Sequence, residues 1–318
     1  MNTAGRLGLY GAGLVVAFGA AYVAAGAIVP DSTVAAWSQA SHADDTGHTA
    51  GEEEVLDTEQ KEQEVTGVTI SASGFTLAPI SAPAATGTAG ELAFRILTSD
   101  GESVTSYDTA HGKQLHLIVV RNDGTENRHV HPELDASTGV WSLPWTWDAA
   151  GTYRVYTDFV SDGTAATLSR TVDVAGTLTP SPATEVITTS SVDGFDVAIS
   201  GDLIAGADSA LTVEVARDGE PVTTLEPYLG AFGHLVALRD GDLAYLHVHA
   251  HGDEPQPGDT AGPTVDFTAD VPSAGRYLLY LDFQVDGQVH TAQFVLDAAA
   301  SDAAPDHGSD GDDEHGGH

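Results

Sequence analysis

Two stretches of the chain alternate apolar and polar side chains with a period of two residues. Short runs rich in Val, Leu, Tyr, Thr and Phe are separated by DG, NDG and AG turn signals over residues 66–175, and again over 192–298. No long stretch after residue 30 has the period of a helix. Each stretch is therefore predicted to be all-β. About 100 residues of short strands are typical of an immunoglobulin-like or cupredoxin-like sandwich.

The two stretches repeat one another. HLIVVRNDGTENRHVHP at 116–132 aligns without a gap to HLVALRDGDLAYLHVHA at 234–250, and AGTYRVYTDF at 150–159 aligns to AGRYLLYLDF at 274–283. A duplication with two copies indicates tandem domains rather than a solenoid. Alternate positions of the second motif are predicted to face the core, and so are the tryptophans of WSLPWTW. These residues are Tyr153, Val155, Phe159, Tyr277, Leu279, Leu281, Phe283, Trp141, Trp145 and Trp147.

The amino-terminal 30 residues are predicted to anchor the protein in the cell membrane. Residues 7–29 form an uncharged apolar run, and this run is long enough for a helix that spans the hydrocarbon core. Arg6 precedes this run and many acids follow it, so the positive-inside rule places everything after Pro30 outside the cytoplasm. A cleaved signal peptide is the alternative, because Ala25-Gly26-Ala27 resembles a cleavage site. Both alternatives make the two domains extracytoplasmic.

Three further segments have compositions that do not favour a packed core. Residues 31–65 are acidic and poor in large apolar side chains, and are predicted to be a flexible stalk. Residues 176–191 are rich in Thr, Ser and Pro and are predicted to be a linker. Residues 299–318 form an acidic tail that carries histidines.

The composition excludes several classes of partner and site. The chain has 47 acidic and 11 basic residues, a net charge of -36, which disfavours nucleic acid and anionic lipid as partners. It has no cysteine, so disulfides, thiolate zinc sites, iron–sulfur clusters and blue-copper centres are excluded. Its single methionine is Met1, so a thioether site for Cu(I) is excluded too. Any metal site must use His, Asp, Glu or backbone oxygen.

Three histidines of the first repeat are predicted to share one face of a hairpin. His129 and His131 alternate with Val130 along a strand, so they point the same way. If Asp123-Gly124 forms a two-residue turn, residues pair when their numbers sum to 247, which places His116 opposite His131. Opposed Cβ atoms lie about 4.5–5.5 Å apart. Two imidazoles can reach one ion from there, so the sequence predicts a site for Cu(II) or Zn(II).

The second repeat keeps the same spacing in His234, His247 and His249, and a second three-histidine site is predicted there. Asp158 and Asp282 occupy matching positions in the late strand of each repeat. Each is predicted to be a fourth ligand or a partner that orients an imidazole, with an ordinary surface carboxylate as the alternative. For the histidines, the alternative is a buried structural role with hydrogen-bonded tautomers.

The anchor, the AGTYRVYTDF and AGRYLLYLDF strands and the histidine hairpins together resemble bacterial copper-handling β-sandwich proteins of the CopC-like and YtkA-like sort. This resemblance implies a membrane-anchored or secreted sandwich that binds copper outside the cytoplasm. In CopC-like proteins a free amino-terminal histidine commonly binds Cu(II), and Met-rich segments take Cu(I). This sequence has neither feature, so zinc is predicted alongside copper.

A second resemblance concerns GDLAYLHVHAHGDE, which is similar to the first cupin motif through Gly241, His247, His249 and Glu254. It implies a metal-dependent enzyme. The first repeat departs from this motif, and Tyr277 stands where a later cupin histidine would be expected. No nucleophile–base pair, phosphate loop or acid/base pair of carboxylates is visible in the sequence, so the protein is predicted not to be an enzyme.

Together these patterns predict a single-pass, extracytoplasmic protein that binds a divalent metal ion for capture, buffering or delivery. Its predicted partners are the metal ion, the cell membrane through the amino-terminal helix, and a protein that donates or accepts the metal. The alternatives are a cupin-type enzyme and a structural or protein-interaction ectodomain without metal.

Overall fold

The computed structural model describes residues 66–246 and 248–301. The chain divides into two compact units, Met1–Gln60 and Lys61–His318. The first unit falls wholly outside the described residues, as do the remainder of the predicted stalk, His247 and the tail after residue 301. The predicted anchor and stalk therefore stay predictions. Within the described ranges the structure holds no helix with the length and apolar character of a membrane span.

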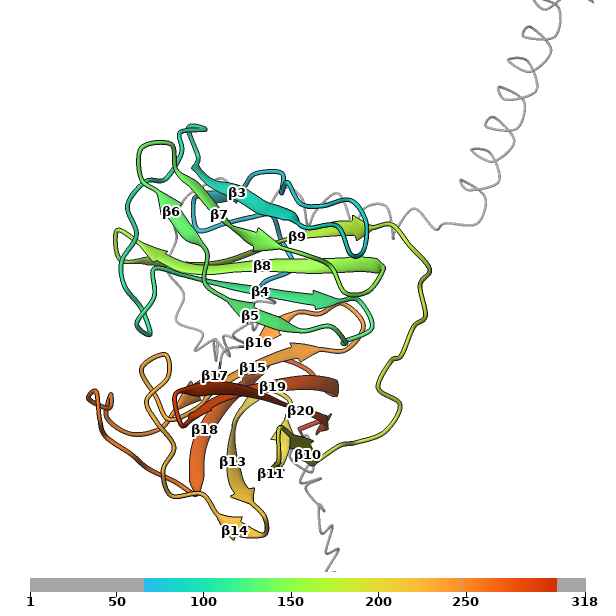
Figure 1. Ribbon diagram of the computed structural model, residues 1–318, viewed down its shortest axis with the longest axis vertical. Coiled ribbons are helices and arrows are strands. Elements are labelled where there is room, and N and C mark those ends of the chain that lie inside the picture. Colours follow the sequence, from blue (N-terminus) through green and yellow to red (C-terminus); the bar gives the residue numbers. More distant parts are fainter. Residues whose placement is uncertain (1–65, 247, 302–318) are drawn as a thin grey trace, which may run out of the picture. The chain divides into compact units, whose positions relative to one another are not determined.

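The first repeat folds into an immunoglobulin-like β-sandwich of two antiparallel sheets (Figure 1). One sheet has the strand order β1-β2-β3-β7-β6 and the other has the order β5-β4-β8-β9. The strands are β1 (Ser71–Ala72), β2 (Phe75–Leu77), β3 (Gly90–Thr98), β4 (Leu115–Arg121), β5 (Arg128–Val130), β6 (Glu133–Asp135), β7 (Val140–Trp145), β8 (Gly151–Ser161) and β9 (Thr164–Val174).

The second repeat folds into a sandwich of the same kind. Its sheets have the orders β10-β11-β13-β18-β17, with β14 on β13, and β12-β20-β19-β15-β16. The strands are β10 (Thr189–Val192), β11 (Phe195–Ser200), β12 (Leu203–Ile204), β13 (Ala207–Arg217), β14 (Glu220–Pro221), β15 (His234–Arg239), β16 (Tyr245–Leu246), β17 (Val248–Ala250), β18 (Thr264–Val271), β19 (Gly275–Val285) and β20 (Gln288–Ala299). Strand β10 begins inside the segment 176–191 that the sequence indicates as a linker.

The residues that alternation assigns to the core are buried in both sandwiches. The named positions of β8 and the three tryptophans belong to the first core, and those of β19 belong to the second. Tyr153 donates its hydroxyl to the Ala149 carbonyl at 2.8 Å, and Tyr277 donates to the Ser273 carbonyl at 2.8 Å. The same tyrosine therefore fixes the loop before the same strand in each repeat.

A third apolar cluster lies between the two sandwiches, on the outer faces of β4, β8, β15 and β19. Its buried members are Ile118, Val120 and Tyr156 from the first repeat, with Val236, Leu238, Leu243, Tyr245, Leu278, Tyr280 and Val295 from the second. These strands are thus buried on both faces, which explains why LHLIVV and YLLYL read as nearly continuous apolar runs. The sequence distinguishes the core face from its opposite, but it does not show that the opposite face is covered.

Two hydrogen bonds cross this cluster in reciprocal fashion. Tyr156 donates its hydroxyl to the Leu243 carbonyl, and its counterpart Tyr280 donates to the Gly124 carbonyl at 2.6 Å. Burial raises the pKa of both tyrosines. Because equivalent residues make equivalent contacts, the repeats meet in the manner of an isologous dimer within one chain.

We expect Tyr280→Phe to lower the free energy of unfolding by about 1–3 kcal/mol, because it leaves the buried Gly124 carbonyl without its donor. Urea unfolding of the full chain measures this loss. Tyr156→Phe should produce a loss of similar size. If both variants unfolded at the wild-type urea concentration, the reciprocal contacts would not stabilise the pairing of the repeats.

Candidate metal centre

The hairpin of the first repeat has the register that the sequence predicts. Ile118 lies opposite His129 and Leu117 lies opposite Val130, so paired numbers sum to 247. The predicted two-residue turn is wrong, since β4 ends at Arg121 and β5 begins only at Arg128.

The reason for the wider turn is a polar network within it. Arg121 donates through Nε and a terminal nitrogen to the two carboxylate oxygens of Asp123, at 2.9 and 2.8 Å. Thr125 also donates its hydroxyl to Asp123, at 2.8 Å. Glu126 adopts a left-handed conformation, with φ of 56°. The Asp-Gly pair therefore belongs to a broader loop.

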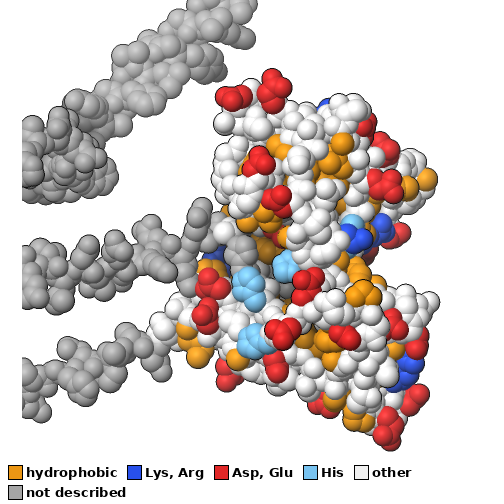
Figure 2. All heavy atoms as spheres, turned by 90° about the vertical axis from the view of Figure 1, so that its left-hand side faces the viewer, with side chains coloured by type: hydrophobic (Ala, Val, Ile, Leu, Met, Phe, Trp, Pro, Cys, Tyr) orange, Lys and Arg blue, Asp and Glu red, His pale blue; other side chains and the backbone are white. Residues whose placement is uncertain are grey.

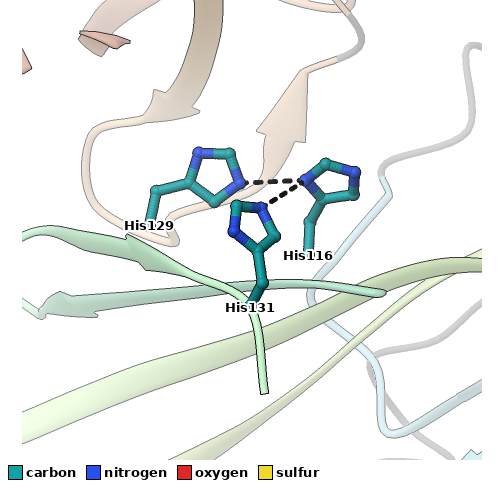
Figure 3. A group of neighbouring side chains, drawn as sticks. All are labelled: His116, His129 and His131. Carbon is teal, nitrogen blue, oxygen red and sulfur yellow. Dashed lines mark hydrogen bonds between the residues drawn. The ribbon is translucent and has the colours of Figure 1, made fainter. Parts of the chain in front are cut away.

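Three histidine side chains converge beside this hairpin (Figure 3). His116 Nδ1 lies 3.1 Å from His129 Nε2 and 3.3 Å from His131 Nε2. Ligand atoms bound tetrahedrally to zinc at 2.0–2.1 Å stand about 3.3 Å from one another. These two distances match the edge of such a coordination tetrahedron, and the ligand atoms of all three residues lie within 4.8 Å of one another.

The outward ring nitrogens of two of these histidines have acceptors. His116 Nε2 lies 3.3 Å from the Ala110 carbonyl oxygen, and His129 Nδ1 lies 2.8 Å from Asp282 Oδ2. If both rings are neutral, each has one N–H, and the acceptors favour placing it on the outward nitrogen. The nitrogens that face each other across 3.1 Å then both present lone pairs. A metal ion or an added proton is needed between them.

Asp282 reaches this centre from the second repeat. Its side chain is 5% exposed and the His129 side chain 2% exposed, so the contact is shielded from water. Thr291 donates to the other carboxylate oxygen of Asp282 at 2.6 Å, which fixes the carboxylate in place. The sequence places Asp282 with the histidines of its own repeat, whereas the structure pairs it with a histidine of the other repeat.

Asp158 holds the matching position in the first repeat. It lies directly opposite His116 in the β4–β8 ladder, and Thr167 donates to it at 2.7 Å. Its predicted role as a ligand stays a prediction.

The histidines of the second repeat do not gather in the same way within the part of the chain that the structure describes. His234 pairs with Asp282 in the ladder, and its ring centroid lies 5.0 Å from His129 and 5.5 Å from His116. It is thus directed at the first repeat's centre. His249 is exposed and lies in β17, which pairs with β18 of the opposite sheet. His247 lies outside the described residues.

The separation of His234 from His249 has a simple cause. Strand β16 follows β15 for only two residues, Tyr245 and Leu246, before the chain crosses to the other sheet. Alternation along a continuous strand therefore no longer holds at His249. His234 and His249 thus lie in strands of different sheets, although both line one cavity, and the predicted three-histidine site of the second repeat stays a prediction.

Burial keeps His116, His131 and His234 neutral. Burial, and next the charge of His129, lower the pKa of His116 to about 4. The same two causes lower the pKa of His131 to about 3. Burial also places the pKa of His234 well below its usual value. All three are unprotonated near neutral pH, which is the form that binds metal.

Two groups that sequence reasoning missed lie at this centre. His111 has its ring centroid 6.2 Å from His116 and 6.0 Å from His234, and the Ala110 carbonyl receives the His116 bond. The repeat alignment gave no signal for His111, because its counterpart is Leu229. The HG dipeptide is a turn signal, and His111 and Gly112 do form a tight turn with φ of 50° and 72°.

In the metal-free chain, we expect the free energy of unfolding to fall as pH drops from about 6.5 towards 4. The unfolded histidines take up protons at their ordinary pKa, whereas His116 and His131 stay neutral in the fold. Each such histidine contributes up to about 1.4 kcal/mol per pH unit. Urea unfolding in the presence of a chelator, between about pH 7 and pH 5, measures the slope.

His116→Gln and His131→Gln should each flatten this dependence. A wild-type stability that is constant over the same range would contradict the neutral, buried state of these imidazoles.

Comparison with known proteins gives the chain a family. No curated protein matches the sequence significantly. Among solved structures, the chain is similar to the adhesin InvE of Yersinia pseudotuberculosis, with 13% identity, a TM-score of 0.22 and coverage of 72% of this chain and 60% of that one. It is also similar to invasin, a bacterial integrin-binding protein, with 14% identity, a TM-score of 0.21 and coverage of 71% of this chain and 39% of that one. A third similar structure is Salmonella alpha-2-macroglobulin, with 13% identity, a TM-score of 0.22 and coverage of 70% of this chain and 16% of that one.

This chain therefore spans less than two thirds of each of those three proteins. A family match is more extensive. It covers residues 69–176 and again 190–300, once for each sandwich, which confirms the internal duplication. The chain belongs to the family described as Domain of unknown function (DUF8832), of which it carries two copies.

Proposed function

We propose that this protein binds one divalent d-block ion, Zn(II) or Cu(II), through His116, His129 and His131. Its role is to capture, buffer or deliver that ion outside the cytoplasm, on a chain anchored by its amino-terminal segment. A protein that donates or accepts the ion is the expected partner. In this proposal the protein binds the ion and catalyses no reaction.

The observation that carries this proposal is the 3.1 Å approach of His116 Nδ1 and His129 Nε2. The Ala110 carbonyl and the Asp282 carboxylate accept from the opposite ring nitrogens, which fixes both tautomers. A histidine that only stabilised a fold would direct its N–H groups and lone pairs to complementary partners. With both rings neutral, two lone pairs face each other here, and a shared metal ion or an added proton resolves that repulsion; the proposal assigns the metal ion.

The contact between His129 and Asp282 is of a kind found around bound metals. A metal-binding histidine commonly donates its second N–H to a carboxylate, which orients the ring and makes the ligand nitrogen more basic. Three neutral imidazoles suit Zn(II) and Cu(II). Three protein ligands leave further coordination positions for water or another side chain.

The charge of the chain favours the same function. A net charge of -36 attracts cations and raises their concentration at the surface. It also fits a metal-binding role better than one that recognises anionic substrates. The CopC-like and YtkA-like resemblance supports copper, and the lack of thioether and thiol ligands is equally compatible with zinc.

The cupin-like alternative has less support from the geometry. His249 and Glu254 line one cavity, and His249 is exposed on β17. Tyr277, at the position of the later cupin histidine, is buried in the core of the second sandwich. A cupin-type centre would therefore lack a ligand from that strand.

Calorimetric titration of the full chain with Zn(II) and Cu(II), beside the variant His129→Ala, tests the proposal. We expect the variant to bind one ion fewer at high affinity, because it loses a central ligand. The histidines of the acidic tail are common to both proteins, so their contribution cancels in the difference. Identical titrations of the two proteins would contradict the proposal.

We also expect Asp282→Asn to weaken metal binding about 10–100-fold, as removal of a carboxylate behind a metal-bound histidine commonly does. Asp193→Asn is the matched control, since the Asp193 carboxylate also lies 2.8 Å from a histidine ring nitrogen, that of His290, and borders a different cavity. The control should leave the affinity of the centre within about twofold, a change of about 0.4 kcal/mol. Equal losses in both variants would contradict the role of Asp282.

A further inference from the structure

A cavity of about 590 Å³ lies next to the three converging histidines. Its lining includes His111, His234, His249, His251 and Glu254. Figure 2 shows histidine side chains gathered on one face of the molecule beside acidic ones. The three-histidine centre does not itself account for this second group of imidazoles.

His234 belongs both to the cavity and to the surroundings of the centre. It lines the cavity, and its ring lies 5.0 Å from His129 and 5.5 Å from His116. These separations match those among the three converging rings themselves, which are 5.0–5.3 Å. His234 is thus placed as closely to His116 and His129 as those ligands are to each other.

His111 extends the series of rings towards solvent. It is exposed, it lines the cavity, and its centroid lies 6.0 Å from His234 and 6.2 Å from His116. Its tight turn is held to the centre by the Ala110 carbonyl, which accepts from His116. The imidazoles therefore form a continuous series from the surface to the buried ligands.

The spacing of this series is short enough for two neighbouring rings to bind one ion together. With metal–nitrogen bonds of 2.0–2.1 Å, two imidazoles on opposite sides of an ion have centroids about 6.4 Å apart. All the separations quoted fall below that bound. When the side chains turn their ring nitrogens towards one another, an ion can therefore bond to the next imidazole before its bond to the previous one breaks.

We propose that this cavity is the loading port of the metal centre, and that His111 and His234 pass the ion between solvent and the three buried histidines. The ion first exchanges one bound water for His111, and then a second water for His234. It bonds to His116 and His129 as the bond to His111 breaks. His234 is the exchangeable fourth ligand, contributed by the second repeat. This inference rests on the proposed metal-binding function.

Glu254 and the neighbouring Asp253 also line the cavity and give it negative charge. Such charge attracts a divalent cation and repels anions. The chemistry of the walls therefore fits a hydrated metal ion better than an anionic substrate.

Stopped-flow loading of the full chain with Co(II), and release to a chelator, tests the port. Co(II) replaces zinc and reports its coordination by visible absorption. We expect His111→Ala to slow loading and release by similar factors, at least about fivefold each, with the affinity of the centre almost unchanged. A histidine that binds the ion only during its passage lowers the activation barriers of loading and of release equally, so its loss slows both.

His234→Ala should slow both steps and also change the visible spectrum of the loaded protein, because a ligand is lost. His290→Ala is the control, since His290 is a buried histidine of the second repeat that borders a different cavity. It should change neither the rates nor the spectrum.

The outcomes separate this inference from the proposed function. Wild-type rates in both His111→Ala and His234→Ala, with tight binding retained, would overturn the port and leave the metal centre intact. A wild-type chain that binds no Co(II), Zn(II) or Cu(II) at the three histidines would overturn the proposed function, and the port with it.

Discussion

The proposed metal centre depends on the packing of the two sandwiches against each other through their outer sheet faces. Ile118, Val120 and Tyr156 meet their counterparts across this interface, and the two tyrosines exchange hydrogen bonds. This packing brings the Asp282 carboxylate to His129, which is 153 residues away in sequence. Without it, His129 would have no carboxylate behind it, and His234 would not approach the centre. The pairing of the repeats is therefore part of the site.

A duplicated chain has two copies of every group, yet the described residues assemble one set of converging imidazoles. The equivalent residues His116 and His234 stack on each other across the interface, with centroids 5.5 Å apart and planes at 4°. Both side chains point towards the same region of the interface, so the two repeats contribute residues to one proposed centre. The second repeat supplies Asp282 and His234, and the first supplies the three ligands.

Local alternation was sufficient to predict much of the first repeat. It identified the core face of AGTYRVYTDF and the shared face of His129 and His131, because both follow from the period of two along a strand. The register of the hairpin was instead predicted from the position of the Asp-Gly turn, and it is correct although the turn is wider. The pairing of Asp282 with His129 could not be predicted in this way. Alternation shows that a face lies opposite the core, but it carries no information about which distant surface covers that face.

The departures in detail have local physical causes. The turn at Asp123 is wider than an Asp-Gly pair predicts, because Arg121 and Thr125 bind the carboxylate and a broader loop forms around it. His249 leaves the face of His234 because the chain changes sheets after Leu246. The repeat alignment gave no signal for His111 because its counterpart in the second repeat is Leu229 and not a histidine. Each case depends on contacts that no periodicity encodes.

The most direct test of this account is zinc K-edge X-ray absorption of the full chain loaded with one equivalent of Zn(II). The account predicts a first shell dominated by imidazole nitrogens at about 2.0–2.1 Å, with the outer-shell scattering of at least three histidine rings. A shell made mainly of carboxylate and water oxygens would place the ion on the acidic surface of the chain. That result would contradict a metal centre at His116, His129 and His131.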